Sequence, residues 1–84
     1  MTAPYVLYKT DICPFCMMVR RFLSQRGLKL PLKDTLLDAT ARAELVAGGG
    51  RATVPCLRIE NADGSYQWMY ESRDIMAFLA EQEF

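Results

Sequence analysis

Short strand-like runs alternate with longer helix-like segments along this chain, and that alternation restricts its fold more than any other feature. Residues 5–8 (YVLY) form an aromatic and β-branched run, which is typical of a buried strand. Pro14 suits the first turn of a helix, and the apolar spacing after it predicts a helix that stops at Gly27. Residues 28–33 (LKLPLK) alternate apolar and polar side chains, and because Pro31 lies among them we expect an edge strand.

The middle of the chain predicts a second helix. Asp38 or Thr40 can provide its N-cap, since both side chains accept hydrogen bonds from the free amides at a helix start. The helix is expected to run to about Ala47, where the glycine triplet at 48–50 ends it.

The last part of the chain predicts a hairpin and a third helix. Residues 54–60 and 66–70 are strand-like, and the Ala-Asp-Gly turn at 62–64 joins them. Ser72 can cap a helix that follows the hairpin. The inner face of that helix is expected to hold Ile75, Phe78 and Leu79.

These segments follow the order β-α-β-α-β-β-α. A length of 84 residues allows one domain, residues 1–84, with a single modest core. Strands separated by helices favour parallel pairing, and the hairpin adds an antiparallel pair. We therefore expect an α/β fold in which helices pack on a small mixed sheet.

Composition and charge exclude several classes of function. The formal net charge is zero, so there is no basic excess to neutralise a phosphate backbone, and nucleic acid is not an expected partner. No apolar run reaches the ~18 residues of a membrane span, and the first residues (MTAPYVLYK) lack the pattern of a secretory signal. We expect a cytoplasmic monomer without a membrane partner.

The cysteines carry the clearest chemical signal. An odd count of three argues against a disulfide-stapled secreted domain and favours a reducing compartment. Cys13 and Cys16 form a C-x-x-C pair where the first strand ends and the first helix begins. There, unpaired amides and the helix dipole stabilise a thiolate at Cys13, while Cys16 lies one turn further in and can close a disulfide with it.

The residues alone leave two other interpretations of this pair open. Both cysteines could be small apolar residues that are buried at a helix start. A zinc site needs about four ligands, whereas Cys56 is the only other cysteine and the chain has no histidine. We therefore expect no metal site.

With TDICPFC at 10–16 and RATVPCL at 51–57, the chain resembles the glutaredoxins over nearly its whole length. The resemblance implies a thioredoxin-like fold, with a four-stranded mixed sheet flanked by three helices, and a cis bond before Pro55, which would face the cysteines. It also implies an enzyme that reduces protein–glutathione mixed disulfides and disulfides, in which catalytic Cys13 attacks and Cys16 resolves. Glutathione would be the co-substrate, no cofactor would be tightly bound, and glutathionylated or disulfide-containing proteins would be the partners.

The residues around the second motif suggest how glutathione is held. A cis bond before Pro55 would leave the N–H and C=O of Val54, next to Thr53, free to pair with an extended peptide such as glutathione. Arg51 can bind the glycine carboxylate, and an arginine in a solvated loop is the alternative. Ser72 at a helix start can bind the γ-glutamyl carboxylate, and a plain N-cap is the alternative.

Some positions differ from the pattern of the glutaredoxins. Phe15 stands where that family often has tyrosine, and it keeps an aromatic wall. Lys9 lies one residue before the family's usual lysine, and its long side chain keeps it a candidate ligand of glutathione. Where glutaredoxins usually have a glycine pair after the fourth strand, this chain has residues 70–73 (YESR). Glu71 and Ser72 resemble instead the N-terminal domain of glutathione transferases, in which glutamate takes the γ-glutamyl ammonium and serine its carboxylate. Cys56 is expected in the core, with a third redox sulfur as the alternative.

The leading hypothesis is therefore a glutathione-dependent thiol–disulfide oxidoreductase of the glutaredoxin type. Glu71 and Ser72 motivate an alternative, a glutathione-binding module or sensor with little redox turnover. A third hypothesis is transfer of an iron–sulfur cluster by a glutathione-bridged dimer. Pro14 and Cys16 argue against it, because relatives specialised for that work usually carry one cysteine, followed by glycine.

Overall fold

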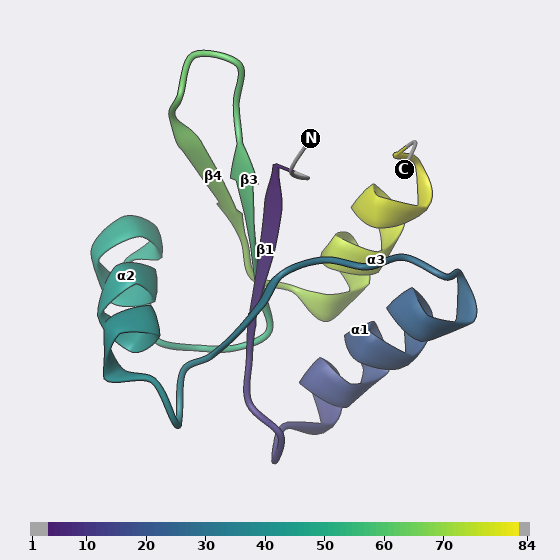
Figure 1. The fold of residues 1–84 in the computed structure, drawn as a ribbon, viewed down its shortest axis with the longest axis horizontal. Coiled ribbons are helices and arrows are strands. Elements are labelled where there is room, and N and C mark those ends of the chain that lie inside the picture. The colour runs from purple at the N-terminus through teal and green to yellow at the C-terminus, as the bar shows by residue number, and fades with distance from the viewer. Residues whose placement is uncertain (1–3, 83–84) are drawn as a thin grey trace.

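The computed structural model describes residues 4–82 and has the predicted order of elements, β-α-β-α-β-β-α (Figure 1). The elements are β1 (Tyr5–Lys9), α1 (Pro14–Gln25), β2 (Leu32–Asp34), α2 (Ala39–Gly49), β3 (Cys56–Glu60), β4 (Tyr66–Met69) and α3 (Ser72–Ala80). The strands pair in the order β2-β1-β3-β4. β1 is parallel to β2 and antiparallel to β3, and β4 is antiparallel to β3. The predicted four-stranded mixed sheet with three helices is confirmed.

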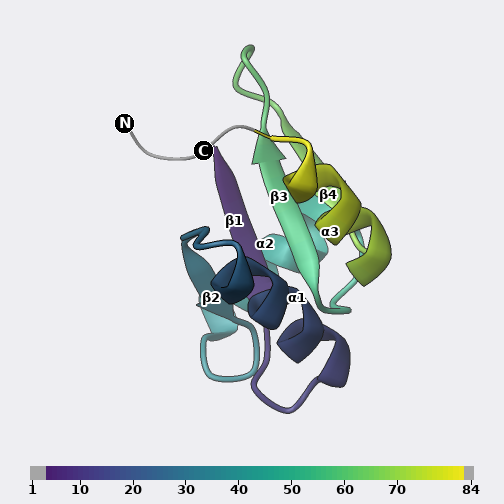
Figure 2. The same cartoon turned by 90° about the vertical axis from the view of Figure 1, so that its right-hand side faces the viewer.

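Helices cover both faces of the sheet. Figure 2 shows α1 and α3 side by side on one face, with α2 behind the sheet. Because side chains alternate along a strand, Leu7 and Leu57 point to the α1 and α3 face, whereas Tyr8 and Cys56 point to the α2 face. The core cluster on the first face consists of Leu7, Val19, Leu23, Leu57, Ile59, Ile75 and Leu79, and the cluster on the second of Tyr8, Ala41, Leu45 and Cys56. Among residues 4–82, none of the helices has the length and apolar character that crossing a membrane requires.

Local sequence explains where α1 begins and ends. Cys13 is its N-cap in an extended conformation, and Pro14 follows in the first turn, where its missing N–H leaves no hydrogen bond unmade. Val19 and Leu23 are buried one turn apart against the sheet. Gly27 adopts a φ of +66° just after the helix, as predicted for its stop.

β2 begins later than predicted, at Leu32 instead of residue 28. Leu28 and Leu30 pack against the first core cluster instead of joining the ladder. Pro31 has no N–H to donate, and its carbonyl accepts a hydrogen bond from the Leu7 N–H at 3.0 Å. The prediction that this strand lies at the edge of the sheet is confirmed.

The cap of the last helix differs from the prediction. Glu71 is the N-cap of α3 and Ser72 is its first helical residue, so the prediction that Ser72 caps the helix is wrong. The reason is that Glu71 is already extended, with φ −84° and ψ 129°. Its carbonyl accepts the hydrogen bond from the Ile75 N–H at 2.9 Å that opens the helix.

Asp38 caps α2, and this choice between the two predicted residues follows from its side chain. One Asp38 carboxylate oxygen accepts hydrogen bonds from the amides of Thr40, at 2.9 Å, and Ala41, at 3.3 Å. The helix continues through Gly49, beyond the predicted end at about Ala47.

Gly48 and Gly49 stay helical because aromatic side chains pack directly against them. The Trp68 ring lies where a Cβ on Gly48 would stand, and the Tyr70 hydroxyl lies where a Cβ on Gly49 would stand. Gly50 then ends the helix with a φ of +88°, a left-handed conformation that glycine adopts without strain.

We expect Gly48→Ala to destabilise the fold by about 1–3 kcal/mol, because the added methyl group must displace the Trp68 ring. Urea unfolding measures the change in the free energy of unfolding. Helix propensity alone predicts the opposite sign, a stabilisation of up to about 1 kcal/mol. A more stable variant would therefore contradict this packing.

Candidate functional site

Cys13 lies at the start of α1, where the chain leaves β1. It is half-buried and forms the N-cap, and its carbonyl accepts a hydrogen bond from the Met17 N–H at 3.1 Å. Its Sγ lies 3.6 Å from the carbonyl oxygen of Val54, to which the thiol donates a hydrogen bond. The free amides of the first turn of α1 begin at this residue.

Cys16 is placed very differently from Cys13, although one helical turn separates them. Its side chain has no exposed surface. Burial raises the pKa of the Cys16 thiol to about 11, although a hydrogen bond with the Thr10 backbone opposes the shift. A hydrogen bond with Cys13 joins the two side chains. The pair therefore consists of an accessible sulfur and a buried thiol that stays protonated at neutral pH.

The loop before β3 faces the cysteines. The Val54–Pro55 peptide bond is cis, as predicted, and Pro55 is buried. The Val54 carbonyl points to the Cys13 sulfur. Within residues 4–82, the Val54 N–H makes no backbone hydrogen bond, so it is available to an added extended peptide.

A cavity of about 210 Å³ opens beside this loop. It is lined by Phe15, Arg51, Thr53, Val54, Pro55, Tyr70, Glu71 and Ser72. The structure thus brings together every residue that the sequence predicted to bind glutathione, except Lys9. These residues come from the start of α1, the loop before β3 and the start of α3.

Lys9 does not line the cavity. Its Nζ lies 2.8 Å from a carboxylate oxygen of Asp11 and 3.3 Å from one of Asp34. These two carboxylates, Asp11 foremost, raise the pKa of Lys9. Arg20 also pairs with Asp11, at 2.9 Å. A contact between Lys9 and glutathione stays a prediction, and it would compete with these ion pairs.

Tyr70 is a cavity residue that the sequence analysis did not assign to the site. Its hydroxyl donates a hydrogen bond to the Arg51 carbonyl at 3.0 Å and accepts one from the Arg51 N–H at 3.3 Å. The Arg51 guanidinium carbon lies 4.2 Å from the centre of the Tyr70 ring. Tyr70 therefore fixes both the backbone and the charged group of Arg51 at the cavity. In the sequence, the position of Tyr70 directly before Glu71 and Ser72 was the signal that could have identified it as a cavity residue.

The start of α3 contributes the polar end of the cavity. Ser72 is half-buried and Glu71 is exposed. The first-turn amides of the helix have no partners within it, so together with the Ser72 hydroxyl they form a binding point for a carboxylate. The Glu71 side chain makes no capping hydrogen bond, and it offers a negative charge beside that point.

Cys56 is a core residue, as predicted. It has no exposed surface and belongs to the cluster between the sheet and α2. Burial raises the pKa of its thiol to about 12. The Cys56 thiol also hydrogen-bonds the side chain of Tyr70, which lines the cavity, so it supports the cavity from the core side without being exposed. Within residues 4–82, no three His, Cys, Asp or Glu side chains converge as a metal site requires.

Comparisons with known proteins agree with this architecture. The sequence model of the family described as "Glutathione S-transferase, N-terminal domain" matches residues 12–82, which include both cysteines of the pair, the cis-proline loop and the Glu71–Ser72 motif. A search of curated protein sequences gives no match.

Solved structures show the same fold. A mutant thioredoxin-like protein is 24% identical with a TM-score of 0.68, over 89% of this chain and 97% of the other. Glutaredoxin 2 from Salmonella typhimurium in complex with glutathione is 25% identical with a TM-score of 0.70, over 95% of this chain and 34% of the other. A buckwheat glutaredoxin–glutathione complex is 20% identical with a TM-score of 0.67, over 93% of this chain and 69% of the other. The expected thioredoxin-like fold is confirmed.

We expect iodoacetamide to modify Cys13 before the other cysteines near neutral pH. Cys16 and Cys56 are buried, and their pKa values are raised to about 11 and about 12, so very little of either is thiolate, the reactive form. Labelling of Cys16 should increase as the pH rises toward 11. Mass spectrometry of peptides after timed labelling gives the order. In the Cys13→Ser variant, no cysteine should be labelled rapidly near neutral pH. Rapid labelling of Cys16 at neutral pH would contradict the assignment of Cys13 as the reactive cysteine.

Proposed function

We propose that this chain, which belongs to the family of glutathione S-transferase N-terminal domains, catalyses glutathione-dependent thiol–disulfide exchange through Cys13. One observation carries the proposal. The Cys13 sulfur lies 3.6 Å from the Val54 carbonyl, beside a cavity whose lining has the donors and charges that glutathione requires. Solved glutaredoxin structures with the same fold, two of them complexes with glutathione, support it.

Glutathione would lie along the cavity in an extended form. Its cysteinyl residue would pair with the Val54 N–H, which makes no backbone hydrogen bond, and with the Val54 C=O once the Cys13 thiol no longer donates to it, as an added strand does. Arg51, held by Tyr70, would bind the glycine carboxylate. Ser72 and the first amides of α3 would bind the γ-glutamyl carboxylate, and Glu71 its ammonium group. This orientation directs the glutathione sulfur toward Cys13.

The reaction consists of two exchanges that conserve electrons. The Cys13 thiolate attacks the glutathionyl sulfur of a mixed disulfide, a bond forms between these sulfurs, and the target protein leaves as a thiolate that takes a proton from solvent. The thiolate of a second glutathione then attacks the glutathionyl sulfur. It restores the Cys13 thiolate and releases glutathione disulfide. No general base is required if Cys13 reacts as a thiolate.

The two cysteines would not contribute equally to turnover. Cys16 would have to lose its proton before it could close a disulfide with Cys13, and its pKa is raised to about 11 by burial. At neutral pH only a small fraction of Cys16 is thiolate. We therefore propose that release by a second glutathione is the main route, and that the Cys13–Cys16 disulfide is a side route that gains importance as the pH rises.

A glutathione-binding module with little turnover is the second candidate. Tyr70 favours this second candidate, because its bulky side chain borders the cavity and its ring packs against the Arg51 guanidinium. That function requires glutathione affinity without measurable reduction of mixed disulfides, so binding and turnover must be measured on the same samples.

We expect Cys13→Ser to abolish reduction of a small glutathionyl mixed disulfide. Cys16→Ser should retain most of the rate at neutral pH, because the raised pKa of Cys16 already limits its participation. Glutathione-dependent turnover coupled to a glutathione disulfide reductase measures both. Cys56→Ser serves as a control for thiol loss in the core. Full activity in Cys13→Ser would refute the proposal.

We expect Tyr70→Leu to weaken glutathione binding by roughly fivefold to tenfold, since it removes a cation–π contact and two hydrogen bonds that hold Arg51. Tyr70→Phe should be intermediate, because it keeps the ring and loses only the hydroxyl. Isothermal titration gives the affinities. Tyr66→Leu is the matched control, because the Tyr66 ring lies 4.6 Å from the Arg58 guanidinium, away from the cavity. Equal losses of glutathione affinity in Tyr66→Leu and Tyr70→Leu would contradict the role of Tyr70 in holding Arg51.

A further inference from the structure

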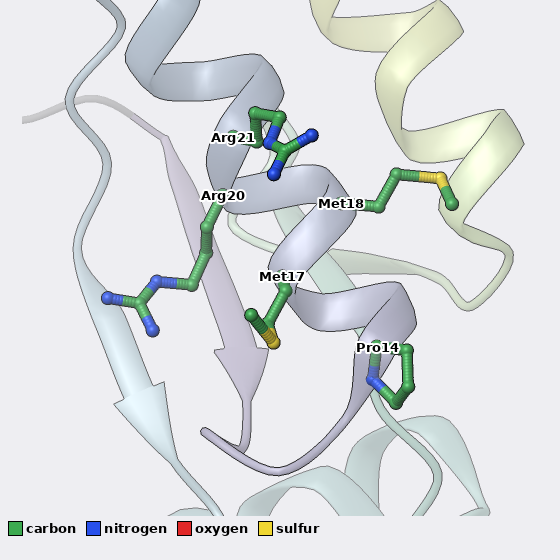
Figure 3. A pocket seen from close by; sticks show the side chains of 5 residues that line it. All are labelled: Pro14, Met17, Met18, Arg20 and Arg21. Carbon is green, nitrogen blue, oxygen red and sulfur yellow. The ribbon is translucent and has the colours of Figure 1, made fainter.

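The outward side of α1 carries a groove that the proposed reaction does not use. It is lined by Pro14, Met17, Met18, Arg20 and Arg21, and its volume is about 630 Å³. We call it the α1 groove. Figure 3 shows Met18 extending from the helix toward α3, whereas Arg20 points the opposite way.

The apolar part of this surface is unusually exposed. Met17 and Met18 line the groove and are 57% and 48% exposed, whereas Ile12 in the loop before the helix is 77% exposed and Phe15, which lines the cavity beside Val54, is 57% exposed. These four residues surround Cys13 in the sequence and lie on the loop before α1 and on its first two turns. Scattered exposed apolar residues are normal, but exposed methionines that line a groove beside a reactive residue mark a surface for contact. Flexible methionines suit partners of variable shape.

The charged side chains that line the groove are both arginines. The sequence of α1 contains no aspartate or glutamate, and it contains Arg20 and Arg21 in the groove. Asp11 neutralises Arg20 in part, at 2.9 Å. Within residues 4–82, no carboxylate forms an ion pair with Arg21. Arg20 also borders a second hollow of about 240 Å³, to which Lys29 adds another positive charge.

The reaction itself places the protein substrate near this groove. When Cys13 attacks a mixed disulfide, the attacking, central and leaving sulfurs lie roughly in line. The glutathionyl part fills the cavity beside Val54 and Ser72, so the protein part must lie outside that cavity. The α1 groove begins at Pro14, the residue next to Cys13, and it offers apolar and positive contacts there.

We propose that the α1 groove docks the protein half of the mixed disulfide, and that it favours an acidic segment with an apolar side chain near the glutathionylated cysteine. This inference rests on the proposed function. The apolar side chain packs on Met17 and Met18, and the acidic side chains face Arg21 and Arg20. Charge complementarity of this kind mainly raises the rate of encounter and the selectivity among partners.

Two synthetic peptides test the selectivity. Each carries a central glutathionylated cysteine and the same apolar neighbour, and the flanking residues are glutamates in one and lysines in the other. We expect kcat/KM to be roughly tenfold higher for the acidic peptide at low salt, and the difference to shrink as salt screens the charges. The mixed disulfide of cysteine and glutathione, which is too short to reach Arg21, measures the basal reaction.

Substitutions in the α1 groove, each matched by a similar substitution on α2, show which surface causes the selectivity between the peptides. Arg21→Glu should lower kcat/KM for the acidic peptide by roughly fivefold and leave the rate with the small mixed disulfide unchanged. Arg42→Glu makes the same change of charge on an exposed residue of α2, on the other side of the sheet, and should leave the preference intact. Met17→Ser should slow both peptides, whereas Val46→Ser, also at an exposed apolar residue of α2, should slow neither.

The outcomes separate this inference from the proposed function. Reduction of the small mixed disulfide without any difference between the peptides, or equal effects of Arg21→Glu and Arg42→Glu, would overturn the docking surface and leave the proposed function standing. If the protein is a dimer in sedimentation experiments and Met17→Ser dissociates that dimer, the groove binds a second copy of the chain. That result would also overturn the proposed docking of a protein substrate. Failure to reduce the small mixed disulfide would contradict the proposed function and the inference together.

Discussion

Strand pairing in the centre of the sheet gathers the candidate site at one end of the molecule. β1 and β3 are antiparallel, and Tyr8 at the end of β1 pairs with Cys56 at the start of β3. The chain that leaves β1 toward Cys13 therefore meets the chain that enters β3 from Val54. Pairing of Leu57 with Met69 brings the end of β4, and with it the start of α3, to the same place. The cavity is built from the start of α1, the loop before β3 and the start of α3, which strand pairing brings to one end of the sheet.

Burial distinguishes the three cysteines, because one is partly exposed and the other two have no exposed surface. The first sulfur of the pair is reachable at the helix start, whereas desolvation raises the pKa values of Cys16 and Cys56 to about 11 and about 12. Lys9 is held by Asp11 and Asp34, so its charge is balanced locally. The accessible sulfur thus lies beside the first turn of α1 and the Val54 carbonyl, while the Lys9 ammonium is paired elsewhere.

The binding cavity combines features of two kinds of protein. Its C-x-x-C pair and cis-proline loop resemble the glutaredoxins, while its Glu71–Ser72 motif and its family match point to glutathione transferase N-terminal domains. Tyr70 connects these parts, because it borders the cavity and holds Arg51 through its ring and its hydroxyl. Gly49 makes room for it, since any side chain there would collide with the Tyr70 hydroxyl. The proposed docking surface for a protein substrate, the α1 groove with its methionines and arginines, lies on the helix that begins beside this cavity.

Local signals in the sequence determined the order of elements and the start of α1 at Pro14, and they narrowed the α2 cap to Asp38 or Thr40, because each depends on neighbours along the chain. The cis bond before Pro55 followed from the resemblance to the glutaredoxins. The resemblance of the chain to known families supplied nearly the whole lining of the cavity. Only the tertiary structure decided that carboxylates hold Lys9 and that Tyr70 positions Arg51. Although Asp11 is a near neighbour of Lys9, the Lys9–Asp34 and Arg51–Tyr70 contacts join side chains that lie far apart in sequence and meet only when the sheet has formed, and no local pattern specifies such meetings.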